Sequence, residues 1–428
     1  MSIQRESGLR RQGPVGLRRP SGYRGLPPVW PARPGGGGGT AFGGQPGTLR
    51  HRLLAKDSPL RQLDWVLLAV VLGLSLIGTL LVWSSTQPGL RQAGADPQTY
   101  LKKQLLNIVI GLIVMGAVTF LDARQLRLFA LPVYALSLLG LVAVLTPLGS
   151  TINGAHAWIS LPAGFQVEPA EYAKLGLILT IAMIFSELRD GDRLPRPRDL
   201  VLACAAALPV LGLVVAEPAL GMTIVILAVT VGMIALSGIR LRWLAALGVA
   251  GVGGVALMVS MHLLKPFQVQ RLTSFANPAA DPLGAGYNAA QAKIAVGSGG
   301  MFGQGLFHGG LVTGRFIPSQ STDFIFTVAG EELGFVGCIT IIVLLGVLLL
   351  RTLRIAATAD DQFGLLAAAG VGIWFAVQSF INIGMTIGIM PVTGIPLPFV
   401  SYGGSAMFAD MIAIGLLQSV HRRHYVFS

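Results

Sequence analysis

Long apolar stretches separated by short polar ones recur along most of this chain. About ten of them reach or approach the length of about 20 residues that a helix needs to cross a bilayer. Helices satisfy their own backbone hydrogen bonds in lipid, and no run alternates apolar and polar positions as barrel strands do. The pattern therefore predicts an all-α polytopic membrane protein with about ten transmembrane helices. The predicted spans are roughly residues 65–84, 104–121, 128–148, 171–186, 200–216, 219–237, 243–262, 324–350, 364–389 and 405–420.

The longest polar interruption, residues 262–323, separates the seventh predicted span from the eighth. Connections of this length are uncommon in compact folds unless they are functional. This loop brings Asp281 and Lys293 together with a glycine-rich backbone, and such groups suit a polar, anionic lipid headgroup. Its residues 288–296 read as a short amphipathic helix. Two simpler interpretations stay open, because Asp281 precedes a proline and could merely shape a turn, and a glycine-rich loop alone says little about phosphate binding.

Composition places the chain outside the soluble globular class. Of the 428 residues, 53% are hydrophobic and 12% are charged, whereas about a quarter of the residues are charged in an ordinary soluble domain. The mean hydropathy is +0.69. Both cysteines, Cys204 and Cys338, fall inside predicted spans and are interpreted as small apolar residues and not as a disulfide.

The net charge of +12 indicates an orientation in the membrane and not a nucleic-acid partner. Residues 1–63 are rich in Gly, Pro and Arg, which predicts a disordered cytoplasmic tail. Loop arginines such as Arg124, Arg240 and Arg351 lie on the same predicted side as this tail, so both chain ends are expected to be cytoplasmic and the long loop to face outward. The predicted parts are the tail 1–63, a membrane domain 64–422 containing the loop 262–323, and a cytoplasmic tail 423–428.

Several ionisable or amide side chains lie within or beside the spans, where they are costly and usually paired or functional. Glu171 and Lys174 are three residues apart on one helix face, so a structural ion pair and a substrate contact are both open. Asn382 is a lone amide, a type that more often joins helices than binds a ligand. Asp323 follows Thr322 in a good N-cap context and is expected to open the eighth helix.

Glu331 and Glu332 lie two turns further along the eighth predicted span. On a regular helix they point about 80° and about 180° away from Asp323, so they cannot share one site with it unless the helix is broken. One of the two is then available to bind a neighbouring helix and the other to line a cavity.

The stretch from Pro391 to Ser405 contains three prolines and three glycines at membrane depth. Irregular backbone is tolerated there only where protein or a watery cavity surrounds it. Its last residues, Gly403-Gly404-Ser405, open the final helix with free N–H groups that favour an anion. A tight re-entrant turn without a ligand is an equally good interpretation.

Taken together, these strings resemble the SEDS family (shape, elongation, division and sporulation), the peptidoglycan glycosyltransferases typified by RodA and FtsW. The similarity covers about residues 60–422, and its motifs are highly specific in combination. The string 281–287 and the run 295–300 look more like the RodA branch than the FtsW branch. The matching strings are 271–287, 291–300, 318 with 322–326, 331–335, and 382–385 continuing through 405.

The resemblance implies an enzyme in the bacterial plasma membrane that polymerises lipid II, a disaccharide-pentapeptide on undecaprenyl pyrophosphate, into β-1,4 glycan strands during cell elongation. Asp281 occupies the family's essential aspartate position and would take the acceptor hydroxyl's proton as general base. The leaving pyrophosphate needs positive charge or N–H donors. The substrate contacts expected from the resemblance are Trp158, Glu171, Lys174, Arg271, Gln291, Lys293, Ser298, Gly299, Gly300, Thr322, Asp323, Asn382, Ser401, Gly403, Gly404 and Ser405.

The partners that the resemblance implies are lipid II, membrane lipids and a class B penicillin-binding protein. A divalent cation such as Mg²⁺ or Mn²⁺ is left open, because no metal-ligand cluster in the sequence specifies one. Two other functions also stay open: a flippase for a lipid-linked precursor, and a catalytically weak scaffold for the penicillin-binding protein. A transporter predicts internal repeats and polar groups at the midplane, and neither is evident in the sequence.

The sequence also departs from the family pattern in the expected substrate groove. Either the groove is rebalanced in charge or the chain is a slower, specialised paralogue, and the retention of Asp281 favours an active enzyme. The departures are Ala157 (usually arginine), Glu168 and Glu217 (usually glutamine), Ala219 (usually aspartate), Gln304 (commonly lysine) and Ser319 (commonly glutamate).

Overall fold

The computed structural model describes residues 62–152, 155–160, 166–187, 195–217, 219–260, 275 and 284–427. The predicted tail therefore lies almost wholly outside the described residues. The elements are α2 (Trp65–Gln92), α3 (Thr99–Thr119), α4 (Ala123–Val144), β1 (Gly149–Ile152), β2 (Ala155–Ser160), β3 (Gln166–Val167), α5 (Pro169–Ser186), α6 (Pro197–Ala216), α7 (Leu220–Leu236), α8 (Leu241–Ser260), α10 (Ala285–Ser298), α11 (Gly310–Thr313), α12 (Ile325–Ala357), α13 (Gln362–Ile387) and α14 (Gly404–Phe427).

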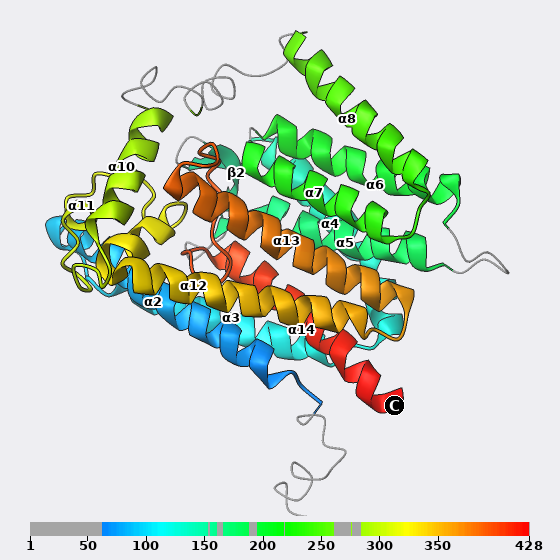
Figure 1. Cartoon of the computed structure of the whole chain (residues 1–428), viewed down its shortest axis with the longest axis horizontal. Coiled ribbons are helices and arrows are strands. Elements are labelled where there is room, and N and C mark those ends of the chain that lie inside the picture. Colours follow the sequence, from blue (N-terminus) through cyan, green and yellow to red (C-terminus); the bar gives the residue numbers. More distant parts are fainter. Residues whose placement is uncertain are drawn as a thin grey trace, which may run out of the picture. The chain divides into compact units, whose positions relative to one another are not determined.

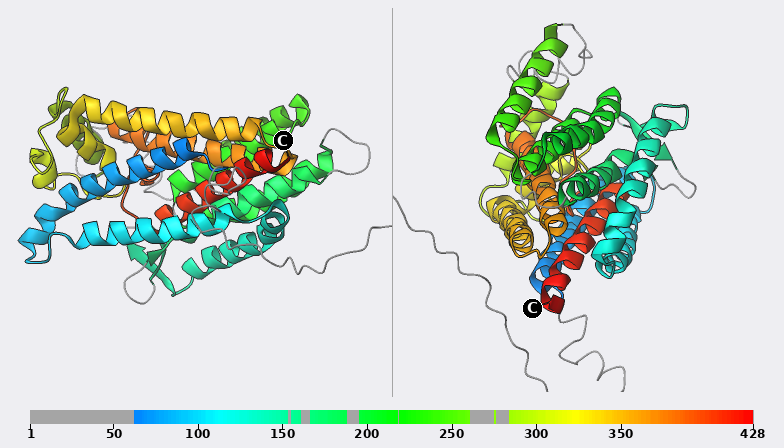
Figure 2. Two further views of the ribbon diagram at one scale, coloured as in Figure 1. Left: turned by 90° about the horizontal axis from the view of Figure 1, so that it is seen from below. Right: turned by 90° about the vertical axis from the view of Figure 1, so that its right-hand side faces the viewer.

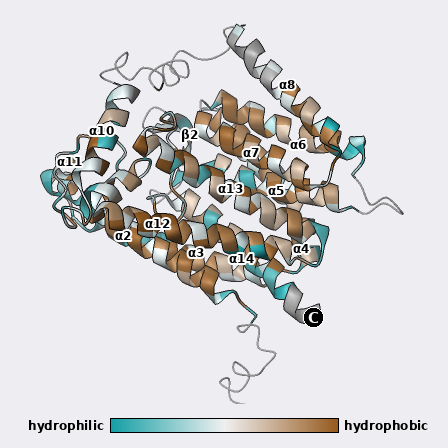
Figure 3. Cartoon of the chain, in the orientation of Figure 1, coloured by the Kyte–Doolittle hydropathy of each residue, from teal (hydrophilic) through white to brown (hydrophobic). Residues whose placement is uncertain are grey.

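Each predicted span overlaps one long helix of the described chain. By length and composition, α2 to α6, α12 and α13 can cross a membrane, while α7 and the apolar part of α8 are shorter. Most of these helices consist largely of hydrophobic residues, which are brown in Figure 3. The prediction of an all-α polytopic membrane protein is confirmed, and the number of ten crossings stays a prediction. The last helix, α14, continues to Phe427, well past the predicted end of its span.

The helices pack around α5 and α13, which are largely buried (Figure 1). α13 packs against α5, α7 and α12, while α2 and α3 join α12 and α14. α10 and α11 lie at one end of the bundle, and the start of α2 and the C-terminus of α14 lie at the other (Figures 1 and 2).

Local sequence signals explain where several helices begin and end. The side chain of Asp64 accepts a hydrogen bond from the Leu67 N–H and caps α2, and Asp361 caps α13 through the Gly364 N–H. α5 begins with Pro169, whose missing N–H would have no helical partner at that position. α13 ends at Gly388, which adopts a left-handed conformation (φ 82°) that disfavours residues with a side chain.

A small antiparallel sheet, ordered β1-β2-β3, connects α4 to α5 and was not predicted. Its strands are four, six and two residues long, too short for an alternating pattern to stand out. Trp158 lies half-buried in β2 opposite Ser150, whose hydroxyl donates a hydrogen bond to the Trp158 carbonyl (3.1 Å).

α12 is broken at Gly334, where φ is 68° and ψ is −163°. Residues 299–305, here called the docking loop, enter this break. A Cβ added to Gly334 would lie 2.2 Å from the Gly303 nitrogen, so only glycine fits. The docking loop takes up the backbone groups that the break leaves free, through hydrogen bonds from Gln304 N to Glu331 O (2.9 Å), Gly305 N to Glu332 O (3.0 Å), Phe335 N to Gly300 O (2.9 Å) and Val336 N to Met301 O (3.1 Å).

The prediction that Asp323 opens the eighth helix is wrong. α12 begins at Ile325, and residues 321–324 form a turn in which the Ser319 carbonyl accepts the Asp323 N–H (3.1 Å). This turn is held by contacts with α13 and with the segment before α14, so a tertiary environment overrides the N-cap signal of Thr322 and Asp323.

Candidate functional site

Glu171 and Lys174 of α5 form an ion pair in the centre of the bundle. Their Nζ–Oε2 distance is 2.7 Å, and both side chains are fully buried. The Lys174 ammonium also donates to Gln378 Oε1 (2.8 Å) and lies 4.3 Å from the centroid of the Trp374 ring. Every side of the ammonium is thus occupied by protein. The structural ion pair is observed, while direct contact of either side chain with a substrate stays a prediction.

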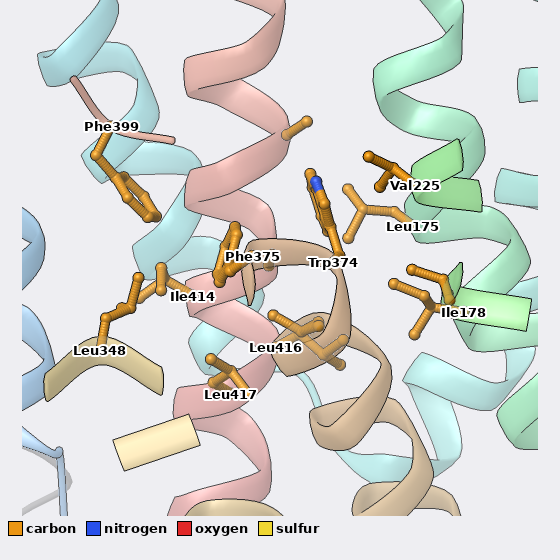
Figure 4. Packing of buried hydrophobic residues seen from close by; sticks show 14 of the residues in the cluster. Leu175, Ile178, Val225, Leu348, Trp374, Phe375, Phe399, Ile414, Leu416 and Leu417 are labelled. Carbon is orange, nitrogen blue, oxygen red and sulfur yellow. The ribbon is translucent and has the colours of Figure 1, made fainter. Parts of the chain in front are cut away.

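Residues 388–403, here called the re-entrant segment, connect α13 to α14 without regular structure. The segment is enclosed by helices and contains buried apolar side chains: the centroid of the Phe399 ring, for example, lies 5.4 Å from that of the Phe375 ring of α13 (Figure 4). Phe399 has a positive φ of 62°, and its N–H donates to Asp410 Oδ2 (3.3 Å) of α14. The segment is therefore an ordered part of the core, as irregular backbone at this depth requires.

The re-entrant segment also holds the turn before α12. Ser401 Oγ donates to the Thr322 carbonyl (2.5 Å), and the Tyr402 N–H donates to the Ser321 carbonyl (2.8 Å). Asn382 Nδ2 of α13 donates to the carbonyls of Asp323 (2.8 Å) and of Ile395 (2.7 Å). Asn382 thus joins elements, as its lone-amide character favours. Thr322, Asp323, Asn382 and Ser401, all predicted site residues, are brought together here.

The start of α5 contacts the start of α14, directly after the re-entrant segment. The Glu168 N–H donates to Ser405 Oγ (2.9 Å), and that hydroxyl donates to the Gln166 carbonyl (3.2 Å). Gly403 and Gly404 are half-buried beside it, and a Cβ on Gly404 would lie 3.5 Å from Asn107 Oδ1 of α3. Ser405 is thus engaged in the fold, while the half-buried glycines keep their backbone accessible.

Two carboxylates that depart from the family pattern lie just outside the helices here. Burial raises the pKa of Glu168 well above its usual range, and the charges of Glu171 and Glu217 raise it further, against the opposing effect of Lys174. Glu217, between α6 and α7, is fully buried, and neither of its carboxylate oxygens has a hydrogen-bond partner among the described residues. Burial raises its pKa to about 8. Within the described part of the chain, the acidic groups Glu168, Glu171 and Glu217 thus share a single nearby ammonium, that of Lys174.

The predicted site residues after Asp281 lie on α10 and the docking loop. α10 spans Ala285–Ser298, which confirms the predicted helix. It carries a half-buried Gln291 and an exposed Lys293 and Ser298. The Lys293 side chain covers the end of α13, since a Cβ on Gly388 would lie 2.9 Å from Lys293 Cδ. Gly299 is buried against α12 and Gly300 is exposed.

Glu331 and Glu332 hold the end of the bundle that contains α10 and α11, and they contact different partners, since successive residues of a helix point about 100° apart. Glu331 accepts the N–H groups of Leu311 (2.7 Å) and Val312 (3.0 Å) in α11. Glu332 Oε1 accepts from Ser84 Oγ of α2 (2.5 Å) and from the Phe307 N–H (3.2 Å). Both carboxylates therefore fix the chain that follows the docking loop.

Two predicted site residues, Arg271 and Asp281, lie outside the described residues. Among the residues that the structure does describe, no group of three or more His, Cys, Asp or Glu side chains is placed to hold a metal ion. Sequence reasoning missed Gln378, which links Lys174 to the re-entrant segment. Its position four residues before Asn382, and therefore on the same helix face, is a signal that could have identified it.

Comparisons with known proteins agree with this architecture. Residues 64–426 match the FtsW/RodA/SpoVE family model, described as "Cell cycle protein". The chain is 36% identical to stage V sporulation protein E of Bacillus subtilis (strain 168) over 370 residues, covering 86% of this chain and 98% of that protein. It is 34% identical to peptidoglycan glycosyltransferase MrdB of Escherichia coli (strain K12) over 373 residues, covering 86% and 95%.

Solved structures give the same result. The chain resembles a chain of a structure titled "Structural coordination of polymerization and crosslinking by a peptidoglycan synthase complex", with a TM-score of 0.69, 32% identity and coverage of 85% and 98%. It also resembles the rod shape determining protein RodA of Thermus thermophilus, with a TM-score of 0.62, 30% identity and the same coverage. Since the family model spans nearly all of the chain outside its N-terminal residues, the protein belongs to the FtsW/RodA/SpoVE (SEDS) family.

Proposed function

We propose that this protein is a peptidoglycan glycosyltransferase that polymerises lipid II into β-1,4 glycan strands. The observation that carries the proposal is the near full-length match to a relative named a peptidoglycan glycosyltransferase, with 95% of that protein covered. The retention of Asp281 within the string 281–287 supports an active enzyme and a RodA-like role in elongation. Identities of 34% to 36% to relatives named FtsW, SpoVE and MrdB favour no branch over another.

In the proposed reaction the acceptor sugar's 4-hydroxyl attacks the anomeric carbon of the donor chain. Asp281 takes the hydroxyl proton, the new glycosidic bond forms with inversion, and the bond to the lipid pyrophosphate breaks. The leaving pyrophosphate requires cationic or N–H donors. Lys293 is the described candidate for this role, because it is exposed on α10, the helix that follows Asp281 in the chain.

The buried ion pair of Glu171 and Lys174 contributes to the proposed reaction through the structure that it holds in place. Lys174 is enclosed by Glu171, Gln378 and Trp374, so we assign it to positioning the re-entrant segment and not to binding the pyrophosphate. We also propose that the chain works with a class B penicillin-binding protein, with both chain ends in the cytoplasm, as the arginine distribution favours.

The test is polymerisation of purified lipid II in proteoliposomes that contain the protein and its transpeptidase partner. We expect glycan strands several disaccharides long, and their formation should depend on this chain. A flippase would instead move fluorescent lipid II between leaflets without forming polymer. A scaffold would form the complex and do neither, and either result would contradict the proposal.

A further inference from the structure

Gln378 is a fully buried amide whose three hydrogen bonds connect separate elements. Its Oε1 accepts from Lys174 Nζ of α5 (2.8 Å) and from Trp374 Nε1 (2.6 Å), and its Nε2 donates to the Pro396 carbonyl of the re-entrant segment (2.9 Å). Two donors on the oxygen fix the amide's orientation, since a flipped amide would place its N–H groups against an ammonium and an indole N–H.

Asn382 continues this arrangement one turn further along α13. Its Nδ2 donates to the carbonyl of Ile395, the residue before Pro396, and to the carbonyl of Asp323. Residues four apart lie on one helix face, so the two amides hold successive carbonyls of the re-entrant segment. This segment has no regular hydrogen-bonding ladder of its own, so its position depends on such side-chain contacts.

The position of the re-entrant segment matters because the segment holds the turn before α12 by hydrogen bonds. Ser401 and Tyr402 donate to the carbonyls of Thr322 and Ser321. One side chain, Gln378, therefore lies between the Glu171–Lys174 ion pair and the segment that sets this turn. Side chains of similar length do not form the same three hydrogen bonds: an ionised glutamate cannot donate to the Pro396 carbonyl, and methionine forms none of the three.

We propose that Gln378 is a positioning residue for the transferase reaction, acting by holding the re-entrant segment at a set distance from the buried ion pair. This inference rests on the proposed function. Displacement of groups around a reacting centre by about 1 Å costs about 100-fold in rate, so loss of the link should lower turnover while lipid II still binds.

Gln418 of α14 provides a matched control. It is also a fully buried glutamine, and it joins two distant segments through hydrogen bonds from the Asp64 N–H (2.9 Å) and to the Asp64 carbonyl (3.0 Å). It lies where α14 meets the start of α2, at the opposite end of the bundle from α10 (Figure 1). Loss of its bonds should therefore lower stability without affecting turnover.

The experiment compares wild type, Gln378→Met, Gln378→Glu and Gln418→Met, each as the full chain with its transpeptidase partner. Thermal unfolding, kcat and KM for lipid II polymerisation are measured at a temperature at which all variants are folded. We expect both methionine variants to lose similar stability. We expect kcat to fall about 10-fold or more in the Gln378 variants only, with KM changed by less than about 3-fold.

Equal kcat values for Gln378→Met and wild type, or an equal loss in Gln418→Met, would overturn the inference. Hydrogen–deuterium exchange of residues 391–403 gives a second readout that needs no activity. Exchange should rise in Gln378→Met and not in Gln418→Met, and unchanged exchange would equally overturn the inference. Failure of wild type to polymerise lipid II would contradict the proposed function, and the exchange result would then test separately whether Gln378 holds the re-entrant segment.

Discussion

Among individual residues, Glu217 is buried at a cost that no contact with the described residues offsets. Its side chain is fully buried, and its carboxylate oxygens have no hydrogen-bond partner within the described part of the chain. Burial raises its pKa to about 8. A folded-state pKa above the unfolded value means that the folded protein binds the proton more tightly. The contribution to stability is then fully present below the unfolded pKa and is lost as the pH rises through about 8.

Glu217→Gln should therefore stabilise the protein at pH 8 and above. The neutral amide removes the cost of a buried unpartnered charge, and the expected gain is about 1–3 kcal/mol. Apparent melting temperatures of both proteins between pH 5 and 9 check this. Wild type should lose stability relative to the variant as the pH rises, whereas parallel curves would show that the Glu217 carboxyl is not the titrating group.

For the Glu171–Lys174 pair we expect the opposite effect, a loss of stability on substitution. Lys174→Met leaves the Glu171 carboxylate buried without its cation, and we expect a loss of about 3–5 kcal/mol. Combining it with Glu171→Gln removes the unpaired charge and should restore part of the loss. Chemical unfolding of the two proteins measures the difference. A single variant as stable as wild type would mean that the pair contributes nothing to the fold.

Among the helices and loops, the insertion of the docking loop into the break of α12 organises the end of the bundle that contains α10 and α11. The docking loop inserts into the break, and Glu331 and Glu332 hold the chain that follows it. Since α10 immediately precedes the docking loop, the position of Lys293 depends on how this loop is held in the break of α12.

Gly334→Ala tests how the docking loop is held in the break. The residue has φ 68°, and a Cβ there would clash with the Gly303 nitrogen at 2.2 Å, so the docking loop must move. We expect a loss of at least about 1–3 kcal/mol and faster hydrogen exchange in residues 299–315. Gly346→Ala, in the same helix with nothing within 4 Å of its Cβ, is the control and should be neutral or slightly stabilising. Similar effects of the two substitutions would contradict the role of the break.

The insertion of the docking loop into α12 could not be predicted from the sequence, whereas other features could. The helices were predictable because bilayer thickness sets their length, and the Glu171–Lys174 pair because the i,i+3 spacing places both side chains on one face. The break at Gly334 and the turn at Asp323 were not, because both depend on backbone groups that are distant in sequence. The partners of Gln378 were equally hidden, since Lys174 and Pro396 come from different elements.

At the scale of the whole molecule, the described contacts begin where the predicted tail ends. Asp64 caps α2, its carboxylate binds Arg351 of α12 (2.6 Å), and its backbone exchanges two hydrogen bonds with Gln418 of α14. This cluster ties α2 to α12 and α14, and none of its members lies in residues 1–55.

Deletion of residues 1–55 should accordingly leave folding and polymerisation unchanged. The measurements are the melting temperature and the polymerisation rate of the truncated protein after correct membrane insertion. A correctly inserted truncation that no longer polymerises lipid II would contradict this prediction and assign the tail a direct function.

Lipid II polymerisation by wild type and by Asp281→Ala, each with the transpeptidase partner, tests whether the chain is a transferase with Asp281 as its base. Asp96→Asn is the control, because Asp96 is an exposed carboxylate paired with Lys102 (2.7 Å) between α2 and α3. We predict polymer from wild type and from Asp96→Asn, and none from an Asp281→Ala protein that still folds and binds its partner. Polymer from Asp281→Ala at the wild-type rate would show that Asp281 is not the catalytic base.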